Sequence, residues 1–111
     1  MAYQIIVKKR FTNKVQKVLA YLEKEWSHKV ATEFLLKIDR RIKLLTKQPH
    51  VGAPSSKVKN IRGLLITRHN SMYYKIKNDK VIIINMYDTR MNPKKNPYWY
   101  NLFRHRSYKK Y

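Results

Sequence analysis

Basic and aromatic side chains alternate at the C-terminal end of this chain. Residues 94–111 contain six Lys or Arg residues, six aromatic residues and no acidic residue. Such interleaving is typical of surfaces that bind single-stranded nucleic acid, because rings stack on bases while cations follow the phosphates. The same pattern also fits a short amphipathic helix that packs on the rest of the fold. The candidate phosphate contacts in this stretch are Lys94, Lys95, Arg104 and Arg106.

Asp88 and Arg90 form a second pattern that can do chemistry. One residue separates them, so on a β-strand their side chains share a face, either as a structural ion pair or as part of a binding site. A metal site is not predicted, because the chain has no Cys and its His residues lack the spacing of metal ligands. Those histidines are His28, His50, His69 and His105.

The net charge of the chain favours an anionic partner. Lys and Arg number 26 against 6 Asp and Glu, which gives a formal charge of +20. Residues 40–111 hold 18 of the basic and 2 of the acidic residues, so this part produces most of the field. Such a field concentrates polyanions, of which nucleic acid is the common case, and it also fits an acidic protein. With 43% hydrophobic residues and 2 Gly, the chain is expected to fold around a core.

Length and apolar runs limit the class of protein. The 111 residues suit one small domain. The longest apolar run is Val81–Ile84, whereas a membrane-spanning helix needs about 20 such residues. The N-terminal stretch also lacks the apolar segment of a secretory signal. We therefore expect a cytoplasmic protein with no membrane contact.

Two amphipathic helices are predicted after a short strand over residues 3–8. In the first helix, apolar residues recur every three or four positions up to Trp26, and Thr12 or Asn13 can cap its start. Ser27 can cap the second helix, which ends at a Pro and Gly near position 50. The tight junction predicts an antiparallel helical hairpin, with Trp26 as an anchor in the core.

Three extended runs follow a loop over residues 49–60 that is rich in Pro, Gly and Ser. Asn78-Asp79 is suited to a two-residue hairpin turn between the last two runs, and the last run is apolar enough for a strand buried on both faces. The element order β-α-α-β-β-β predicts an α+β fold. In that fold, a small, mainly antiparallel sheet packs against the N-terminal helical hairpin. The three runs cover residues 62–69, 72–77 and 80–87.

The element order and several local motifs resemble the RelE/ParE superfamily of type II toxin–antitoxin toxins. Trp26-Ser27 stands between the helices and is followed by A-x-x-F, and L-x-x-x-P-x-x-G ends the second helix. The segment TRHNSMYYKIKNDKVIIINMYDTRMNP is similar to the family's R-H-x-x-x-x-Y-x-I strand, its hairpin and its D-x-R-x-[ND]-P ending. The resemblance covers residues 3–97. We therefore expect a toxin domain over residues 1–97 and a basic, aromatic C-terminal extension over residues 98–111.

The resemblance implies a growth-inhibiting toxin that a cognate, acidic antitoxin neutralises, with no metal or organic cofactor. RelE-like members enter the ribosomal A site and cut mRNA, whereas ParE-like members inhibit DNA gyrase. The long helical hairpin looks more ParE-like, but the +20 charge favours the ribosome and its mRNA. We therefore expect a metal-independent mRNA interferase. The alternatives are a non-nuclease inhibitor of gyrase and a non-toxic nucleic-acid-binding module of the same fold.

The resemblance also implies residues for RNA cleavage. In RelE-like nucleases, Lys and Arg side chains activate the 2′-OH, stabilise the phosphorane and protonate the leaving oxygen. Arg90 matches the basic residue at the end of the last strand, where it would clamp a phosphate or donate a proton. Lys57 and Lys59 fall where these enzymes place activating lysines, with Arg62 close by as a further phosphate contact.

One position departs from the RelE-like pattern. That pattern has an Arg three residues before the strand tyrosine, whereas this chain has Ser71 before Tyr74. Arg68 is the neighbouring cation that could act in its place. Tyr98 or Tyr100 would supply the ring that stacks on a base.

Overall fold

The computed structural model describes residues 2–100 of the chain. A first strand, β1 (Gln4–Val7), leads into two helices, α1 (Lys9–Glu25) and α2 (His28–Lys47). The expected α+β fold and its order β-α-α-β-β-β are confirmed, and a two-residue strand is added inside the predicted loop 49–60. The strands after α2 are β2 (Ala53–Pro54), β3 (Ile61–Thr67), β4 (Asn70–Lys77) and β5 (Lys80–Asp88).

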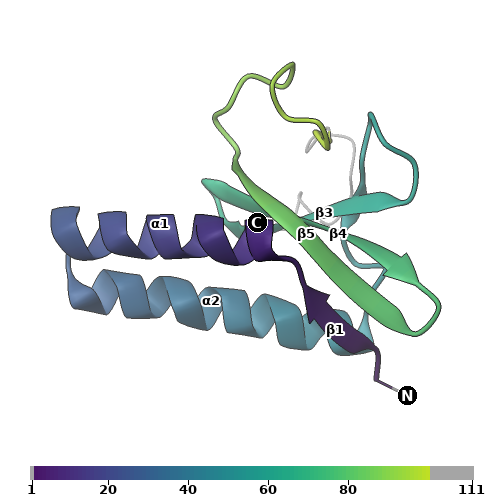
Figure 1. The fold of residues 1–111 in the computed structure, drawn as a ribbon, viewed down its shortest axis with the longest axis horizontal. Helices are drawn as coiled ribbons and strands as arrows, with labels where there is room; N and C mark the ends of the chain where they lie inside the picture. The colour runs from purple at the N-terminus through teal and green to yellow at the C-terminus, as the bar shows by residue number, and fades with distance from the viewer. Residues whose placement is uncertain (1, 101–111) are drawn as a thin grey trace.

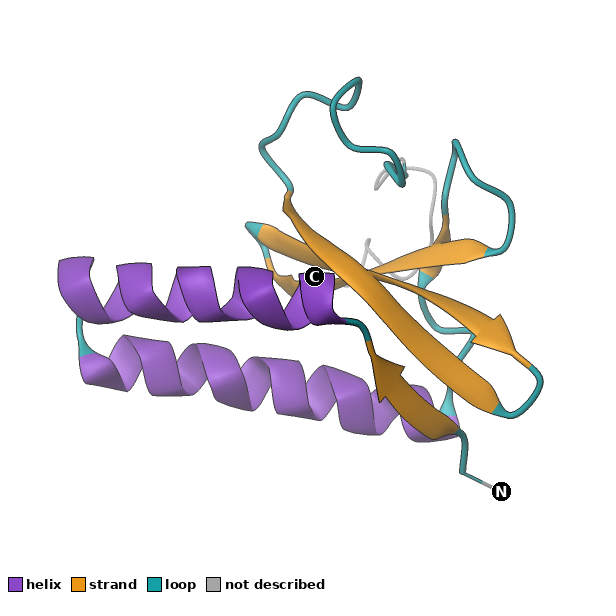
Figure 2. Cartoon of the chain, viewed as in Figure 1, coloured by secondary structure: helices purple, strands orange, loops and turns teal. Residues whose placement is uncertain are grey.

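The five strands form one mixed sheet in the order β1-β5-β4-β3-β2. β1 pairs in parallel with β5, and the other neighbouring strands pair antiparallel. Asn78 and Asp79 connect β4 to β5 as the predicted two-residue turn, with Asn78 in the left-handed region at φ 57°. The two helices lie along one face of the sheet, and the segment after β5 passes over its other side (Figures 1 and 2).

Helix α1 begins earlier than the capping pattern predicted. It starts directly after Lys8, whose side chain makes no capping hydrogen bond, so Thr12 and Asn13 lie inside the helix. The expected cap was wrong because β1 passes directly into the helix, and its pairing with β5 sets where the helix begins. Ser27 caps α2 as predicted, since its hydroxyl accepts the backbone N–H of Val30 at 3.1 Å.

The larger of two cores lies between the helices and the sheet. Trp26, which we expected to anchor it, is 69% exposed at the junction of the helices, so that prediction was wrong. The helical pair extends past the edge of the sheet (Figure 1), so the junction has no strand beneath it. The buried residues of this core are Phe11, Val15, Phe34, Ile38, Leu45, Leu64, Ile66, Met72, Tyr74, Val81, Ile83 and Met86.

The apolar run of β5 alternates in burial, although we expected both of its faces to be buried. Val81 and Ile83 face the helices and are fully buried, whereas Ile82 and Ile84 are partly exposed. A β-bulge beside Ile84 then returns Met86 to the helix side. Among residues 2–100, no helix packs against the second face, and a short segment of irregular chain covers part of it.

That segment forms a second, smaller core on the face away from the helices. Residues 98–100, which we expected to begin the C-terminal extension, pack on the sheet there, and Tyr100 is 3% exposed. Arg104 and Arg106 lie outside the described residues. This core consists of Ala53, Ile61, Tyr73 and Tyr100, with Ile84, Tyr87 and Tyr98 packed against it.

Candidate functional site

The Asp88–Arg90 pattern at the end of β5 forms an ion pair. Arg90 Nε and Nη2 donate to the two carboxylate oxygens of Asp88 at 3.0 and 2.8 Å, and the backbone N–H of Arg90 donates to the same carboxylate at 2.8 Å. These hydrogen bonds hold the pKa of Asp88 below its ordinary value. Both side chains lie at the surface. The Asp88 carboxylate already offsets the positive charge of the Arg90 guanidinium.

Lys57, a predicted activating lysine, contacts the turn that follows β5. Its ammonium donates to the backbone carbonyl oxygens of Pro93 and Asn96, the latter at 2.8 Å. The Ser55 hydroxyl accepts the backbone N–H of Lys57 at 3.1 Å and so fixes the loop around it. Lys57 therefore joins the β2–β3 loop to the segment after β5. Lys59, in the same loop, is exposed.

Arg62 and Arg68 lie at opposite ends of β3. Arg62 donates to the carbonyl oxygen of Gly52 at 2.7 Å, which holds the loop before β2. Arg68 is exposed in the tight turn between β3 and β4. Lys94 and Lys95 are exposed in the turn after β5. The predicted phosphate contacts among the described residues are therefore spread over several loops.

Arg68 and Arg90 come close at one end of the sheet, but the four predicted catalytic cations do not form one site within residues 2–100. The backbones of Arg68 and Arg90 are linked through Thr89, whose hydroxyl donates to the carbonyl oxygen of Arg68 at 2.6 Å. The Arg90 side chain lines a groove on the α1 side together with Tyr21. Lys57 instead contacts the segment that covers the opposite face.

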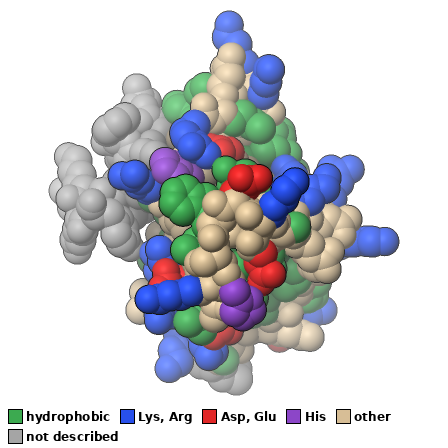
Figure 3. Space-filling view, turned by 90° about the vertical axis from the view of Figure 1, so that its left-hand side faces the viewer, with side chains coloured by type: hydrophobic (Ala, Val, Ile, Leu, Met, Phe, Trp, Pro, Cys, Tyr) green, Lys and Arg blue, Asp and Glu red, His purple; other side chains and the backbone are tan. Residues whose placement is uncertain are grey.

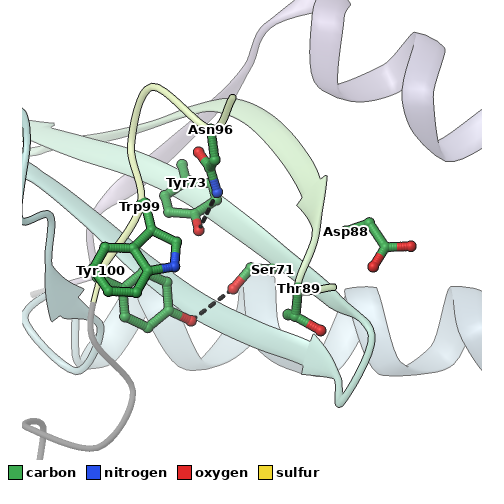
Figure 4. Close-up of a pocket in the computed structure, with 7 residues that line it drawn as sticks. All are labelled: Ser71, Tyr73, Asp88, Thr89, Asn96, Trp99 and Tyr100. Carbon is green, nitrogen blue, oxygen red and sulfur yellow. Dashed lines mark hydrogen bonds between the residues drawn. The ribbon is translucent and has the colours of Figure 1, made fainter. Parts of the chain in front are cut away.

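The two predicted stacking tyrosines, Tyr98 and Tyr100, differ in environment, and Figure 4 shows that of Tyr100. The hydroxyl groups of Tyr100 and Ser71 lie 2.6 Å apart, and Asn96 donates to the hydroxyl of Tyr73 at 3.0 Å. Burial raises the pKa of Tyr73. The Tyr100 ring is thus packed inside the second core, whereas Tyr98 stays partly exposed at its edge.

Three residues make structural contacts that were not expected from the sequence: Ser71, Asn96 and Lys14. Ser71 is 1% exposed and occupies the position where the RelE-like pattern has Arg. Its small side chain leaves room for the Tyr100 hydroxyl. Asn96 carried no signal in the sequence, because its partner Tyr73 is 23 residues away. Lys14 donates its ammonium to the carbonyl oxygen of Met86 at 2.9 Å, and its spacing with Arg10 and Lys17 on α1 could have drawn attention to it.

The groove beside Arg90 lies between α1 and the turn after β3, and its volume is about 530 Å³. Figure 3 looks onto the end of the molecule that carries the helical hairpin, where hydrophobic side chains lie among charges of both signs. Tyr21 and Trp26 are the large exposed side chains of the groove, at 58% and 69%. The groove is lined by Lys17, Val18, Tyr21, Leu22, Trp26, His69, Asn70, Asp88 and Arg90.

Two further features bear on the kind of protein. Within residues 2–100, no helix is long and apolar enough to cross a membrane. In the same described part of the chain, no three His, Cys, Asp or Glu side chains come together as possible metal ligands.

Comparison with known proteins shows the family of this chain. Residues 5–93 match the family model of the ParE toxin of the type II toxin–antitoxin system parDE. A search of curated proteins finds no match. The fold is similar to a structure of the chromosomal ParDE system from P. aeruginosa, with a TM-score of 0.67 and 16% identity over 78% of this chain and 96% of that one.

Two other solved toxins share the fold. The YoeB dimer from Staphylococcus aureus gives a TM-score of 0.54 and 12% identity over 77% of this chain and 94% of that chain. A copper-bound mutant toxin from Helicobacter pylori gives a TM-score of 0.56 and 18% identity over 78% and 94%. At such identities these structures support the fold alone, while the family model matches most of the chain. The chain therefore belongs to the ParE toxin family of type II toxin–antitoxin systems.

Proposed function

We propose that this toxin arrests growth by binding DNA gyrase, the activity of ParE-like members, and not by cutting mRNA. The observation that carries the proposal is the separation of Arg90 from Lys57. The Arg90 guanidinium pairs with Asp88 on the α1 side, and the Lys57 ammonium is bound to two backbone carbonyl oxygens on the other side. An inhibitor that works by binding needs an accessible surface and no catalytic set.

Cleavage of RNA would require these cations to converge. A group that stabilises or protonates a reacting phosphate acts from about 3 Å. Arg90 and Lys57 are instead each held by other groups of this chain, Arg90 by Asp88 and Lys57 by the carbonyl oxygens of Pro93 and Asn96. Ser71 adds to the argument, because it stands where the RelE-like pattern has Arg and its hydroxyl lies 2.6 Å from that of Tyr100. Tyr100, one of the two rings expected to stack on a base, is buried in the same contact, and Tyr98 is partly exposed.

The helical hairpin offers the surface that a binding inhibitor needs. Trp26 and Tyr21 expose large aromatic side chains beside the groove of about 530 Å³. Exposed aromatic residues next to a groove are the type that contributes most to protein–protein binding. We therefore place the contact with the target at this end of the molecule.

The net charge of +20 favours a second candidate, ribosome-dependent mRNA cleavage. Such a charge suits the ribosome, and Lys59 and Arg68 keep exposed cationic side chains. In this alternative, Arg90 must leave Asp88 when RNA binds. Substitution of Arg90 by Ala would then abolish mRNA cleavage.

The two candidates are separated by testing the purified toxin on both targets. We expect it to inhibit DNA supercoiling by gyrase and to leave ribosome-bound mRNA uncut in a primer-extension assay. Trp26→Ala should weaken gyrase inhibition by about tenfold, as is common for an aromatic hot spot. The matched control is Leu36→Ala on α2, where the side chain is 48% exposed and lies outside the groove.

Two results would contradict this assignment. One is mRNA cleavage at the A site that is lost in Arg90→Ala, with gyrase unaffected. The other is an equal loss of gyrase inhibition in Trp26→Ala and Leu36→Ala, which would remove the hairpin end as the contact surface. In cells, inhibition of gyrase predicts that thymidine incorporation falls before methionine incorporation.

Membership in this family implies a cognate antitoxin. We propose that its acidic residues contact the basic surface of the toxin, since opposite charges speed and orient association. Co-expression with the neighbouring gene should restore growth, and the complex should form more slowly at high salt.

A further inference from the structure

A stripe of cations runs along α1, and none of the sites above uses it as a whole. Arg10, Lys14 and Lys17 are spaced four and three residues apart, so they share one face of the helix. At 1.5 Å per residue, the stripe spans about 10 Å. None of the three ion pairs found within residues 2–100 includes any of these side chains. Three like charges on one face repel each other, so the stripe does not serve the stability of the helix.

Lys14 connects the stripe to the sheet. Its ammonium donates to the carbonyl oxygen of Met86 at 2.9 Å and lies 3.5 Å from the centre of the Tyr87 ring. Burial, followed by the charges of Lys17 and Arg10, lowers the pKa of Lys14. The three cations therefore act on one another, and Lys14 holds the Tyr87 ring beside the stripe.

Aromatic rings continue this surface onto the sheet. The rings of Tyr87 and Tyr98 lie 6.3 Å apart, and both side chains are partly exposed. A groove of about 300 Å³ runs between Lys17 on α1 and Tyr87 on β5. Asp88 is the acidic residue of this groove, and its carboxylate is already occupied by Arg90.

We propose that this seam between α1 and β5 binds single-stranded nucleic acid. Arg10 and Lys17 contact phosphates of the strand, Lys14 fixes the Tyr87 ring, and Tyr98 offers an aromatic surface to a base. The proposal goes beyond the proposed function and does not depend on it. Lys17 also lines the groove assigned to gyrase, but binding of a free single strand requires neither gyrase nor a cleavage step.

The chemistry of the seam favours nucleic acid over an acidic peptide. Phosphates recur at regular intervals along a strand, which suits cations evenly placed on one helix face. Partly exposed rings beside the cations add stacking, which an acidic peptide would not use. An acidic peptide remains the ligand that the test must exclude.

The test measures binding of the full-length protein to a fluorescein-labelled 12-nucleotide single strand, as DNA and as RNA, by anisotropy at several salt concentrations. The test variant combines Arg10→Gln with Lys17→Gln. The control combines Lys37→Gln with Arg40→Gln, which removes the same two residue types from exposed positions on α2. Circular dichroism and thermal unfolding check that both variants fold.

We expect the test variant to bind about tenfold more weakly at 0.1 M salt and the control to stay within about twofold. The slope of log K against log salt should become about 1.4 less steep, since each lost phosphate contact on a single strand contributes about 0.7. Tyr98→Leu should weaken binding without changing that slope, because stacking releases no counterions.

Three outcomes would overturn the proposal. Equal weakening in the test and control variants would show that the general field binds the strand and the seam does not. An unchanged salt slope in the Arg10/Lys17 variant would remove these residues from phosphate contact. Tighter binding of a twelve-residue poly-glutamate peptide, lost in the same variant, would identify the seam as a site for an acidic protein.

Discussion

Gly63 lies in β3 beneath the ring of Tyr100, and this close packing leads to a quantitative prediction. A Cβ atom added to Gly63 would lie 2.3 Å from Cε1 of Tyr100 and 2.8 Å from Cε1 of Tyr73. Gly63 does not have a positive φ, so the backbone itself accepts alanine. The substitution Gly63→Ala therefore acts mainly through the collision with the ring.

The chain can relieve this collision by moving the Tyr100 ring off the sheet. The loss in free energy of unfolding is therefore at most what the packing of that ring contributes. Loss of a buried aromatic side chain costs about 3–5 kcal/mol, which includes its contact with Ser71. Alanine recovers about 0.5 kcal/mol by restricting the unfolded chain. We expect Gly63→Ala to lower the free energy of unfolding by about 3 kcal/mol. This corresponds to a fall of roughly 12 °C in Tm for a domain of this size.

A double-mutant cycle with Tyr100→Ala measures this coupling by urea unfolding. In the background without the ring, Gly63→Ala should cost about 1 kcal/mol or less, since only the contact with Tyr73 remains. The coupling is then about 2 kcal/mol. An equal cost of Gly63→Ala in both backgrounds would refute the placement of Tyr100 on the sheet, because the collision would then not involve that ring.

Three further predictions concern the core, a helix end and the surface. Tyr74→Phe should lower stability by about 2 kcal/mol at pH 7, since its hydroxyl accepts the N–H of Gly52 at 2.9 Å in a buried position. Burial raises the pKa of Tyr74 to about 12, so this stability is complete below pH 10. It is lost as the pH rises toward 12, and urea unfolding at pH 8 and 11 should show a smaller difference between parent and variant at pH 11. Ser27→Ala should lower stability by about 1 kcal/mol through loss of the α2 cap, measured by thermal unfolding. Asp88 has its pKa lowered by Arg90, so its stabilising effect is present above pH 4 and lost in acid. Asp88→Asn should therefore flatten the fall in Tm between pH 5 and pH 2.

Local patterns were enough to predict most of the fold. The helical periodicity and the Ser27 cap depend on residues within a few positions of one another, and the Asn78-Asp79 turn is equally local. The start of α1 was not predictable in this way, because the side chain of Lys8 makes no capping hydrogen bond. The pairing of β1 with β5 sets the first residue of the helix instead. The strand β2 has two residues, one of them Pro54, so it carries no strand pattern of its own.

The candidate site was harder to predict because its contacts span long stretches of sequence. Lys57 was expected to be an activating lysine, yet its ammonium contacts backbone carbonyl oxygens that lie 36 and 39 positions further along the chain. Tyr98 and Tyr100 are two residues apart with the same side chain, and only the shape of the sheet decides which ring is buried. Gly63 provides that shape, since it alone in the middle of β3 leaves space for a ring.

The contact between Ser71 and Tyr100 also limits which side chain position 71 can hold. An Arg at position 71 would fill the space beside the Tyr100 hydroxyl and bring an unpaired charge into a position that is 1% exposed. The Tyr100 ring would then have to leave the sheet, which would expose the face away from the helices. With Ser71, the ring stays in place and this face remains covered there. With Ser71 and Gly63 together, this chain has the closed arrangement, in which the Tyr100 ring is buried against the second face of the sheet. A partner that contacts Ser71 from this face must therefore first displace the Tyr100 ring, whose hydroxyl lies 2.6 Å from that of Ser71.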